Sequence, residues 1–373
     1  MQPFEPSNDD MAGQQRVVLS ALRQGPQSTI ELRALHLMSP AARVMDLRRQ
    51  GLDYRHAAER AVRRLRVASG GRMKPCCVTV FATTKPATLG KTYKLGLNGI
   101  EKMTAGQMVE GAYEVRSFGN VHGLAALLAS IRTDQALCAS LPIDGSTSGR
   151  IVTKTAMKDN PGALSRTKDC CALPVGAPAL VILDYDPHGT PLTRDELWAL
   201  LNAACPAIAD CGVVWWCSGS SHLYDGDAEW QGLRGQRFYL VAADGTEAAR
   251  FGDVLAKRLW LSGHGHVAVS ASGSLLVRGI FDAAMFQPAR FDFIEGSVCH
   301  PLLLQRRGQP FFLSEGGWLD TRAALPDLTP DEESRYLAAI DDAKGKAEPE
   351  AKALRMPHSV TDGHGETLCQ ELG

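Results

Sequence analysis

Apolar residues recur at helical spacing near the start of the chain, interrupted by two turn signals. One helix is predicted from Met11 to the stop at Gly25-Pro26. Ser28 is expected to cap a second helix. Ser39-Pro40 is typical of a third helix start, and that helix is predicted over Ala41–Gln50, before a glycine. Three short helices with tight links predict a helix-turn-helix core.

Arginines gather on and after this third helix, and Arg63–Val67 followed by Ser69-Gly70-Gly71 favours a β-wing. A basic helix and wing would meet phosphates on both sides of a DNA groove, whereas the alternative is a three-helix scaffold with a solvated charged face. The stretch Gln14–Tyr54, with ARVMDLRRQGLDY, resembles helix-turn-helix domains of phage and prophage proteins. The predicted DNA-binding residues are Arg43, Arg48, Arg49, Arg55, Arg63, Arg64 and Arg66.

Farther along, the pattern predicts strands at Val78–Ala82 and Thr92–Leu97 and an amphipathic helix over residues 120–140. A charged helix is predicted over Pro330–Arg355, and Met356–Gly373 has no periodicity. With 373 residues and ~100–200 residues per domain, two domains are expected. The predicted segments are 1–10, disordered; 11–75, a winged helix-turn-helix; 76–326, an α+β domain; and 327–373, a charged helix with a disordered tail.

Charge and composition narrow the classes of protein. The net charge is −1, so any affinity for nucleic acid must come from local charge. No apolar run approaches the ~18–20 residues that span a bilayer, and the N-terminus lacks the pattern of a signal peptide. With cysteines inside apolar stretches as well, we expect a cytoplasmic protein with no membrane partner.

The triplet Gly90-Lys91-Thr92 invites comparison with a phosphate-binding P-loop. That motif requires a glycine five positions before the glycine of the triplet, and Lys85 stands there. We therefore do not predict a P-loop.

An acidic pair follows the most apolar strand of the chain. Ala179–Leu183 predicts a buried strand, and Asp184 and Asp186 come directly after it. Residues i and i+2 of a strand lie on one face, so the two carboxylates would repel each other unless a cation lay between them. Mg²⁺ or Mn²⁺ suits such oxygen ligands. The alternative is an ordinary strand exit, because Pro187 and Gly189 are turn residues.

The strand with Asp-x-Asp resembles the first motif of the archaeo-eukaryotic-type primases, the primase–polymerases of phages, plasmids and integrated elements. Val213–His222 resembles their second motif, a strand with a small residue and His, and Ile280-Phe281-Asp282 their third. The resemblance covers about Pro75 to Leu325. It implies a mixed α/β catalytic domain with an RRM-like core, in an α+β chain that begins with the winged helix-turn-helix.

The resemblance also implies roles for single residues. Asp184, Asp186 and Asp282 would be catalytic and hold Mg²⁺ or Mn²⁺. In the second motif, His222 with Ser220 would grip the triphosphate, or Arg237 would replace the histidine in the later register Arg234–Tyr239. Further phosphate contacts are expected from Arg166, Lys168 and Arg278, for each of which a solvated surface charge is the alternative.

The implied function is DNA primase or polymerase activity, a two-metal nucleotidyl transfer that serves a mobile element. Its partners would be template and duplex DNA, nucleoside triphosphates and a separate helicase. One alternative is a non-catalytic DNA-binding initiator or regulator with an inactive primase-like domain. Another is a haloacid-dehalogenase-type phosphatase, but its Asp-x-Asp-x-Thr motif would place Thr where His188 stands, and Asp292 and Glu295 poorly match its late acidic pair.

Overall fold

The computed structural model describes residues 74–97, 99–355, 360–361 and 367–368. The chain divides into two compact units, Met1–Met73 and Lys74–Gly373, and the description below concerns the second. The predicted winged helix-turn-helix, its seven arginines and residues 1–10 lie outside the described residues, so these remain predictions. Within the described ranges, no helix is both long and apolar enough to cross a membrane.

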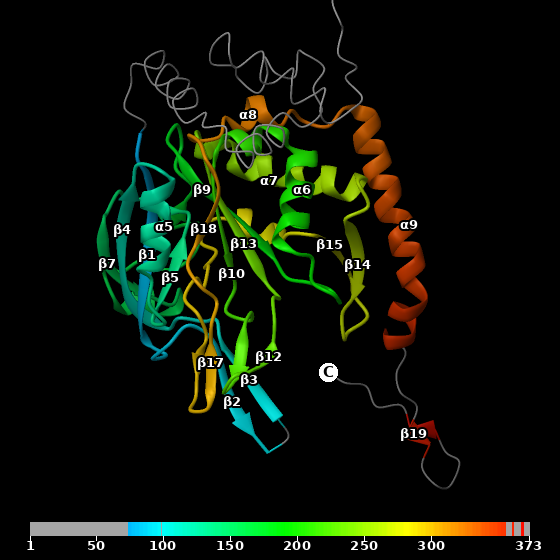
Figure 1. Ribbon diagram of the computed structural model, residues 1–373, viewed down its shortest axis with the longest axis horizontal. Helices are drawn as coiled ribbons and strands as arrows, with labels where there is room; N and C mark the ends of the chain where they lie inside the picture. Colours follow the sequence, from blue (N-terminus) through cyan, green and yellow to red (C-terminus); the bar gives the residue numbers. More distant parts are fainter. Residues whose placement is uncertain (1–73, 98, 356–359, 362–366, 369–373) are drawn as a thin grey trace, which may run out of the picture. The chain divides into compact units, whose positions relative to one another are not determined.

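The second unit is a mixed α+β structure in which most strands pair antiparallel. Its first sheet has the order β5-β1-β4-β7, from Gln135–Cys138, Cys76–Lys85, Glu110–Phe118 and Ser148–Val152 (Figure 1). The predicted strand Val78–Ala82 is confirmed within β1, and its buried positions pack in the core.

Helix α5, Val121–Ala129, begins at Asn120, whose side chain accepts a hydrogen bond from the Gly123 amide. The prediction of a helix within 120–140 is confirmed only for this first half. The second half is wrong, because Gln135–Cys138 is strand β5 and pairs with β1. All four residues of β5 are buried, and a short run buried on both faces cannot be told from a helix by its period.

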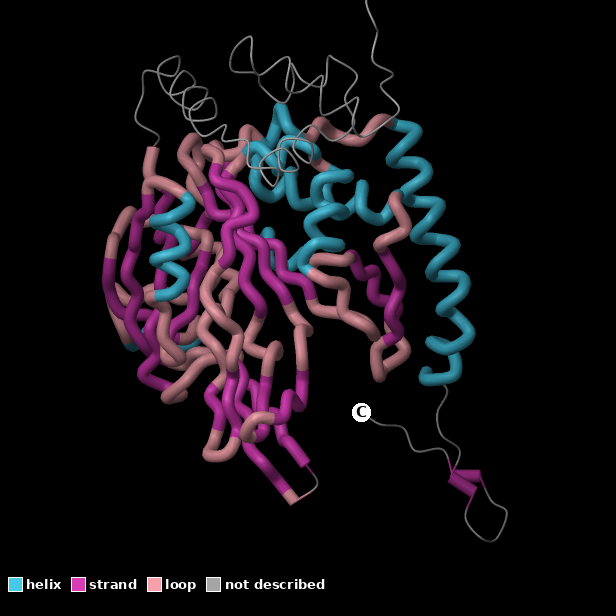
Figure 2. The backbone as a smooth tube through the Cα atoms, in the orientation of Figure 1, coloured by secondary structure: helices cyan, strands magenta, loops and turns pink. Residues whose placement is uncertain are grey.

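The second sheet has the order β18-β10-β13-β9, with each neighbouring pair antiparallel (Figure 1). Two helices cover one of its faces (Figure 2). In chain order the elements are β9 (Ala179–Tyr185), α6 (Arg194–Ala204), β10 (Gly212–Cys217), β13 (Gln236–Ala242), α7 (Ala248–Leu261) and β18 (Phe311–Glu315).

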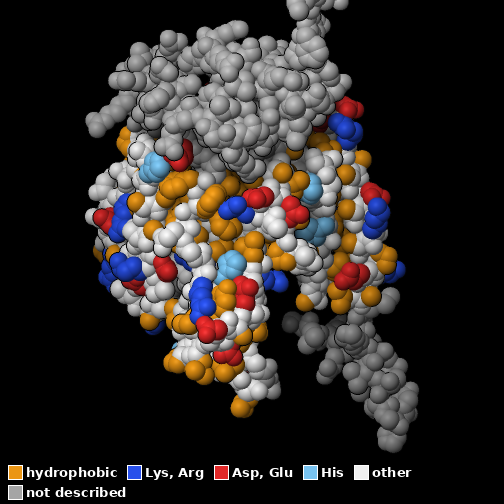
Figure 3. Space-filling view, in the orientation of Figure 1, with side chains coloured by type: hydrophobic (Ala, Val, Ile, Leu, Met, Phe, Trp, Pro, Cys, Tyr) orange, Lys and Arg blue, Asp and Glu red, His pale blue; other side chains and the backbone are white. Residues whose placement is uncertain are grey.

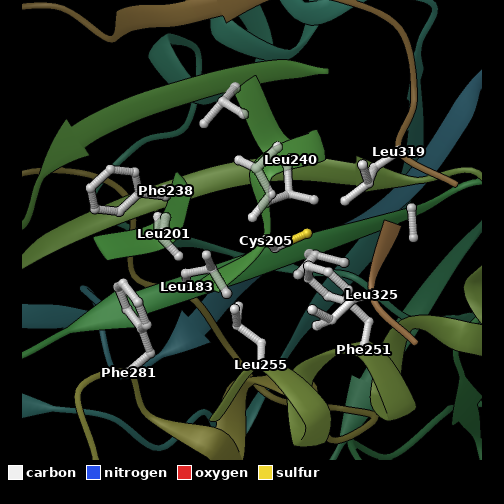
Figure 4. Close-up of a cluster of buried hydrophobic side chains, with 14 of the residues drawn as sticks. Leu183, Leu201, Cys205, Phe238, Leu240, Phe251, Leu255, Phe281, Leu319 and Leu325 are labelled. Carbon is white, nitrogen blue, oxygen red and sulfur yellow. The ribbon is translucent and has the colours of Figure 1, made fainter. Parts of the chain in front are cut away.

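Strand β9 is buried on both faces, which explains its unbroken apolar sequence. Its odd-numbered residues, such as Leu183, lie in one core with Leu201 of α6 and Phe251 of α7 (Figure 4). Its even-numbered residues, Leu180 and Ile182, pack in a second core with β1 and α5. Because side chains alternate along a strand, Asp184 continues this even-numbered row.

A group of short strands projects from the two sheets (Figure 1). The predicted strand Thr92–Leu97 is confirmed as β2, Gly90–Gly96, which forms a hairpin with β3, Gly99–Ala105. Hydrophobic side chains are exposed on this projection, as Figure 3 shows near its tip. The other strands there are β11 (Leu223–Asp225), β12 (Ala228–Gln231), β16 (Val298–Cys299) and β17 (Leu303–Gln305).

The predicted charged helix is confirmed as α9, Pro330–Arg355. It packs on α7 and on the hairpin of β14 (Gly265–Val269) and β15 (Leu275–Gly279), with Lys257 2.9 Å from Glu333. The remaining elements are β6 (Leu141–Pro142), β8 (Cys171–Ala172), α8 (Thr321–Ala324), the 3₁₀ turns Thr155–Asp159, Pro206–Asp210, Gly245–Glu247 and Ala283–Phe286, and the pair β19 (Val360–Thr361) and β20 (Thr367–Leu368). The rest of the tail predicted to be disordered lies outside the described residues.

Replacing Leu201 by Ala should lower the free energy of unfolding by about 2–5 kcal/mol, because its side chain is fully buried between α6 and the sheet. Leu337→Ala on α9 is the matched control, since that leucine is 54% exposed and its loss should cost less than about 1 kcal/mol. Chemical denaturation of both variants measures the difference. Equal effects would contradict the placement of this core.

Candidate functional site

One face of the second sheet carries the even-numbered residues of β9. This face changes from apolar to charged at the end of that strand. Ile182 lies opposite Tyr239, and two residues on, Asp184 lies opposite Arg237. Arg237 in turn lies opposite Trp216 of β10. The antiparallel register therefore places an acid, an arginine and an aromatic ring in one row across three strands.

Arg237 is shared between two carboxylates. Its Nε lies 2.7 Å from Oδ1 of Asp292 and 3.4 Å from Oδ1 of Asp184. These contacts are ion pairs rather than hydrogen bonds, because neither Arg237 Nε nor Asp292 Oδ1 has a hydrogen-bond partner among the described residues. Its Nη1 donates to the Phe293 carbonyl at 3.0 Å. Protein partners therefore engage Nε and Nη1 of Arg237, whereas Nη2 has no protein partner among the described residues.

Asp292 is held in place from two sides. The Tyr239 hydroxyl donates to its Oδ2 at 2.8 Å, and its backbone exchanges hydrogen bonds with Leu137 of β5 at 2.8 and 2.9 Å. Its side chain has no exposed surface. From the sequence we considered Asp292 only as a poor match to a phosphatase motif. We did not predict that Asp292 shares Arg237 with Asp184. Its partners lie far away in sequence, so no local pattern could have indicated it.

One cation cannot compensate two buried carboxylates, and the titration of the group reflects this. Burial raises the pKa of Asp184 to about 6; Arg237 opposes the shift, while Asp292 and Asp186 add to it. Burial also raises the pKa of Asp292 in spite of Arg237. Burial alone would lower the pKa of Arg237, but the two carboxylates outweigh it and raise that pKa. With both acids ionised, Asp184, Arg237 and Asp292 together carry a net charge of −1, which the more distant Lys91 and Arg307 offset in part.

Asp186 lies beyond the end of β9, against the turn that enters β13. Its Oδ1 is 3.0 Å from the position that a Cβ on Gly235 would occupy, and the Ser218 hydroxyl crowds the same position. The Ser218 amide donates to the Gly235 carbonyl at 2.8 Å, and its hydroxyl lies 2.9 Å from that of Ser220. A glycine at 235 thus lets a carboxylate and a serine-rich turn approach each other.

Lys91 of β2 is near enough to both aspartates to interact with them electrostatically, but it forms no ion pair with either. Burial lowers its pKa, Asp186 and Asp184 oppose that shift, and Arg237 adds to it. From the sequence we considered Lys91 only as part of a P-loop motif and rejected that motif. We made no prediction about Lys91 outside a P-loop. Its place beside the acidic pair depends on how the β2–β3 hairpin docks, which the spacing of the motif could not reveal.

Of the two candidates for the second motif, Arg237 lies beside Asp184. His222 lies on the projection, with a left-handed φ of 55° and its Nδ1 3.0 Å from Glu229 Oε1. Its backbone accepts from the Arg306 amide at 2.9 Å. Ser220, through Ser218, links this loop to the turn at Gly235.

Asp282 adjoins the centre through its backbone. Its amide donates to the Asp184 carbonyl at 2.8 Å. Its carboxylate, 40% exposed, accepts from the Ala284 amide at 3.0 Å and lies 3.9 Å from Arg290. The other predicted phosphate contacts are not gathered here: Arg278 lies opposite His266 in the β14–β15 hairpin, Arg166 lines a separate pocket, and Lys168 is exposed on the same loop.

Within residues 74–355, no three His, Cys, Asp or Glu side chains are grouped as a metal site. Asp184 and Asp186 nevertheless fit one divalent cation by their chemistry, because they are oxygen donors with an uncompensated charge. Mg²⁺ commonly binds one or two carboxylates and completes its shell with substrate phosphates and water. Asp282 as a further ligand stays a prediction.

No protein-family model matches this chain, and searches of curated proteins and of solved structures find no match either.

Asp184→Asn should stabilise the protein increasingly as the pH rises. The pKa of Asp184 in the folded protein, about 6, lies above its ordinary value of 3.8. The protonated Asp184 therefore contributes fully to the free energy of unfolding below about pH 4, and this contribution is lost as the pH rises through 6. The variant should gain at most about 3 kcal/mol relative to the wild type by neutral pH. Unfolding measured across this range tests it, with exposed Asp195→Asn as control. A pH-independent difference would contradict the buried, proton-holding carboxylate.

Arg237→Met should lower the free energy of unfolding by about 3–5 kcal/mol at neutral pH, because it leaves two buried carboxylates without a cation. The loss should shrink as the pH falls, since both acids then take up protons. Arg335→Met, which removes an exposed pair with Asp331 on α9, should cost less than about 1 kcal/mol. A loss that does not depend on pH would show that Arg237 acts by packing alone.

Proposed function

We propose that the chain is a metal-dependent nucleotidyltransferase of the primase–polymerase type that acts on a DNA template. The observation that carries the proposal is the paired Asp184 and Asp186 at the end of a buried strand, with excess negative charge and Lys91 near them. The succession β9-α6-β10-β13-α7-β18 supports it, because β-α-β-β-α-β is the pattern of RRM-like cores. In the sheet these strands lie in the order β18-β10-β13-β9. The last strand of the succession, β18, therefore pairs with the second strand, β10.

In this proposal Asp184 and Asp186 hold Mg²⁺ or Mn²⁺. Such ions, when bound, activate a 3′-hydroxyl and stabilise the pyrophosphate that leaves. Lys91 contacts the triphosphate, since a lysine at the carboxylate pair supplies a charge of the right sign. The hydroxyls of Ser218 and Ser220 are further donors beside Asp186.

Arg237 takes a different role from the one implied by the resemblance. Its Nε and Nη1 already contact Asp292, Asp184 and the Phe293 carbonyl, and its side chain is 11% exposed. In this proposal its Nε and Nη1 make it a positioning residue that holds Asp184, and only Nη2 is left for a phosphate. A cation bound at Asp184 would compete with a proton, because this carboxyl is protonated below about pH 6.

One observation favours the non-catalytic alternative, a DNA-binding initiator with an inactive primase-like domain. The Asp282 carboxylate caps a turn and lies 3.9 Å from Arg290, so protein groups already engage the predicted third metal ligand. A substrate phosphate would then have to act as the third ligand of the metal in place of Asp282. No contact among the described residues favours the phosphatase.

Template-directed synthesis with Mn²⁺ and labelled nucleotides tests the proposal. The wild type should extend a primer, and Asp184→Asn/Asp186→Asn should reduce the rate by at least about a thousandfold, because the cation loses both protein ligands. Asp195→Asn, an exposed aspartate in the first turn of α6, should keep wild-type activity. No synthesis by a folded wild type that still binds DNA would favour the initiator alternative.

A further inference from the structure

A pocket of about 180 Å³ lies in the part of the unit built on the first sheet. Its walls are the loop 107–109, the end of β7 with the residues after it, 151–154, and the segment 166–167. Phe291 forms one side. None of the centre's residues, Asp184, Asp186, Lys91 or Arg237, lines it.

Arg166 is the unusual residue of this pocket. Its guanidinium carbon lies over the Phe291 ring, 4.2 Å from the ring centre, in a cation–π contact. In the described part of the chain, no carboxylate pairs with it and no acceptor receives a hydrogen bond from it. Burial lowers its pKa, Cys138 opposes this, and the like charge of Arg290 adds to it.

Arg166 is half-buried and has no protein anion among the described residues, so its guanidinium is free to pair with an anion that enters the pocket. The surrounding donors are of the kind that bind an anion: Lys154 lines the same pocket, as do the hydroxyl residues Thr153 and Thr167. Lys154 has an exposed acidic partner, Asp169, at 3.6 Å. The planar guanidinium, packed over Phe291, suits the two-pronged recognition of a phosphate.

We propose that this pocket binds a phosphate group of a nucleotide or of a single-stranded nucleic acid, at a site separate from the carboxylate pair. That the phosphate belongs to a nucleotide or nucleic acid rests on the proposed function. The pocket and the centre share one short segment: Phe291 stacks under Arg166, Asp292 holds Arg237, and Arg290 faces Asp282. A phosphate at Arg166 would thus lie against the same segment that positions Asp184.

The test measures binding without catalysis. The full chain is titrated in EDTA with fluorescein-labelled oligo(dT) and, separately, with a fluorescent ATP analogue. Arg166→Met keeps an apolar side chain over Phe291 and removes the charge, and it should weaken binding by roughly tenfold or more. Arg322→Met, which removes a 72%-exposed arginine on α8, is the matched control and should bind as the wild type does.

The two probes distinguish the sources of the phosphate. Loss of affinity for oligo(dT) alone supports a strand phosphate, loss for the ATP analogue alone supports a nucleotide, and loss for both supports a site open to either. Unchanged affinity for both probes overturns the proposal. Because no divalent cation is present, a failure of primer synthesis leaves this result untouched.

Stability provides a second readout. Without ligand, Arg166→Met should melt at the same temperature as the wild type or higher, because an uncompensated cation has been removed. A lower melting temperature together with unchanged binding would show that Arg166 serves the fold, and would overturn the proposal.

Discussion

The arginine that two buried carboxylates share is the interaction on which the rest of the site depends. Arg237 joins Asp184 on β9 to Asp292 on a loop that also pairs with β5, so it ties the second sheet to the first. Because one positive charge faces two negative ones, the trio retains excess negative charge in a place with little water. In the proposed function, that excess is what would attract a further cation to the end of β9.

Alternation along the strands explains why the charge gathers there. On the face that carries the even-numbered residues of β9, Leu180 and Ile182 fill the core together with Tyr239 and Val241 of β13. The next pair along the two strands on this face is charged: Asp184 and Arg237. The opposite face remains apolar and is covered by α6 and α7. The site is thus the place where the buried row of the sheet ends, and Gly235 leaves room for Asp186 beside it.

The sequence allowed some of this to be predicted and some not. Strand β9 with its acidic pair and helix α9 follow from local patterns, and both are confirmed as elements. The second half of the helix predicted within 120–140 was wrong because β5 is buried on both faces. Lys91, Asp292 and the contacts of Arg237 depend on pairing between distant segments, which a single sequence does not reveal. The metal, the DNA and the role of Asp282 stay predictions.

The most direct test of the account is the binding of Mn²⁺ to the wild type, measured by calorimetry from about pH 5 to about pH 8. If the excess charge of the trio holds a cation, the affinity should rise as the pH passes about 6, with release of a proton below that pH, and Asp184→Asn should remove both effects. An affinity that does not change with pH, or that survives in Asp184→Asn, would contradict the account.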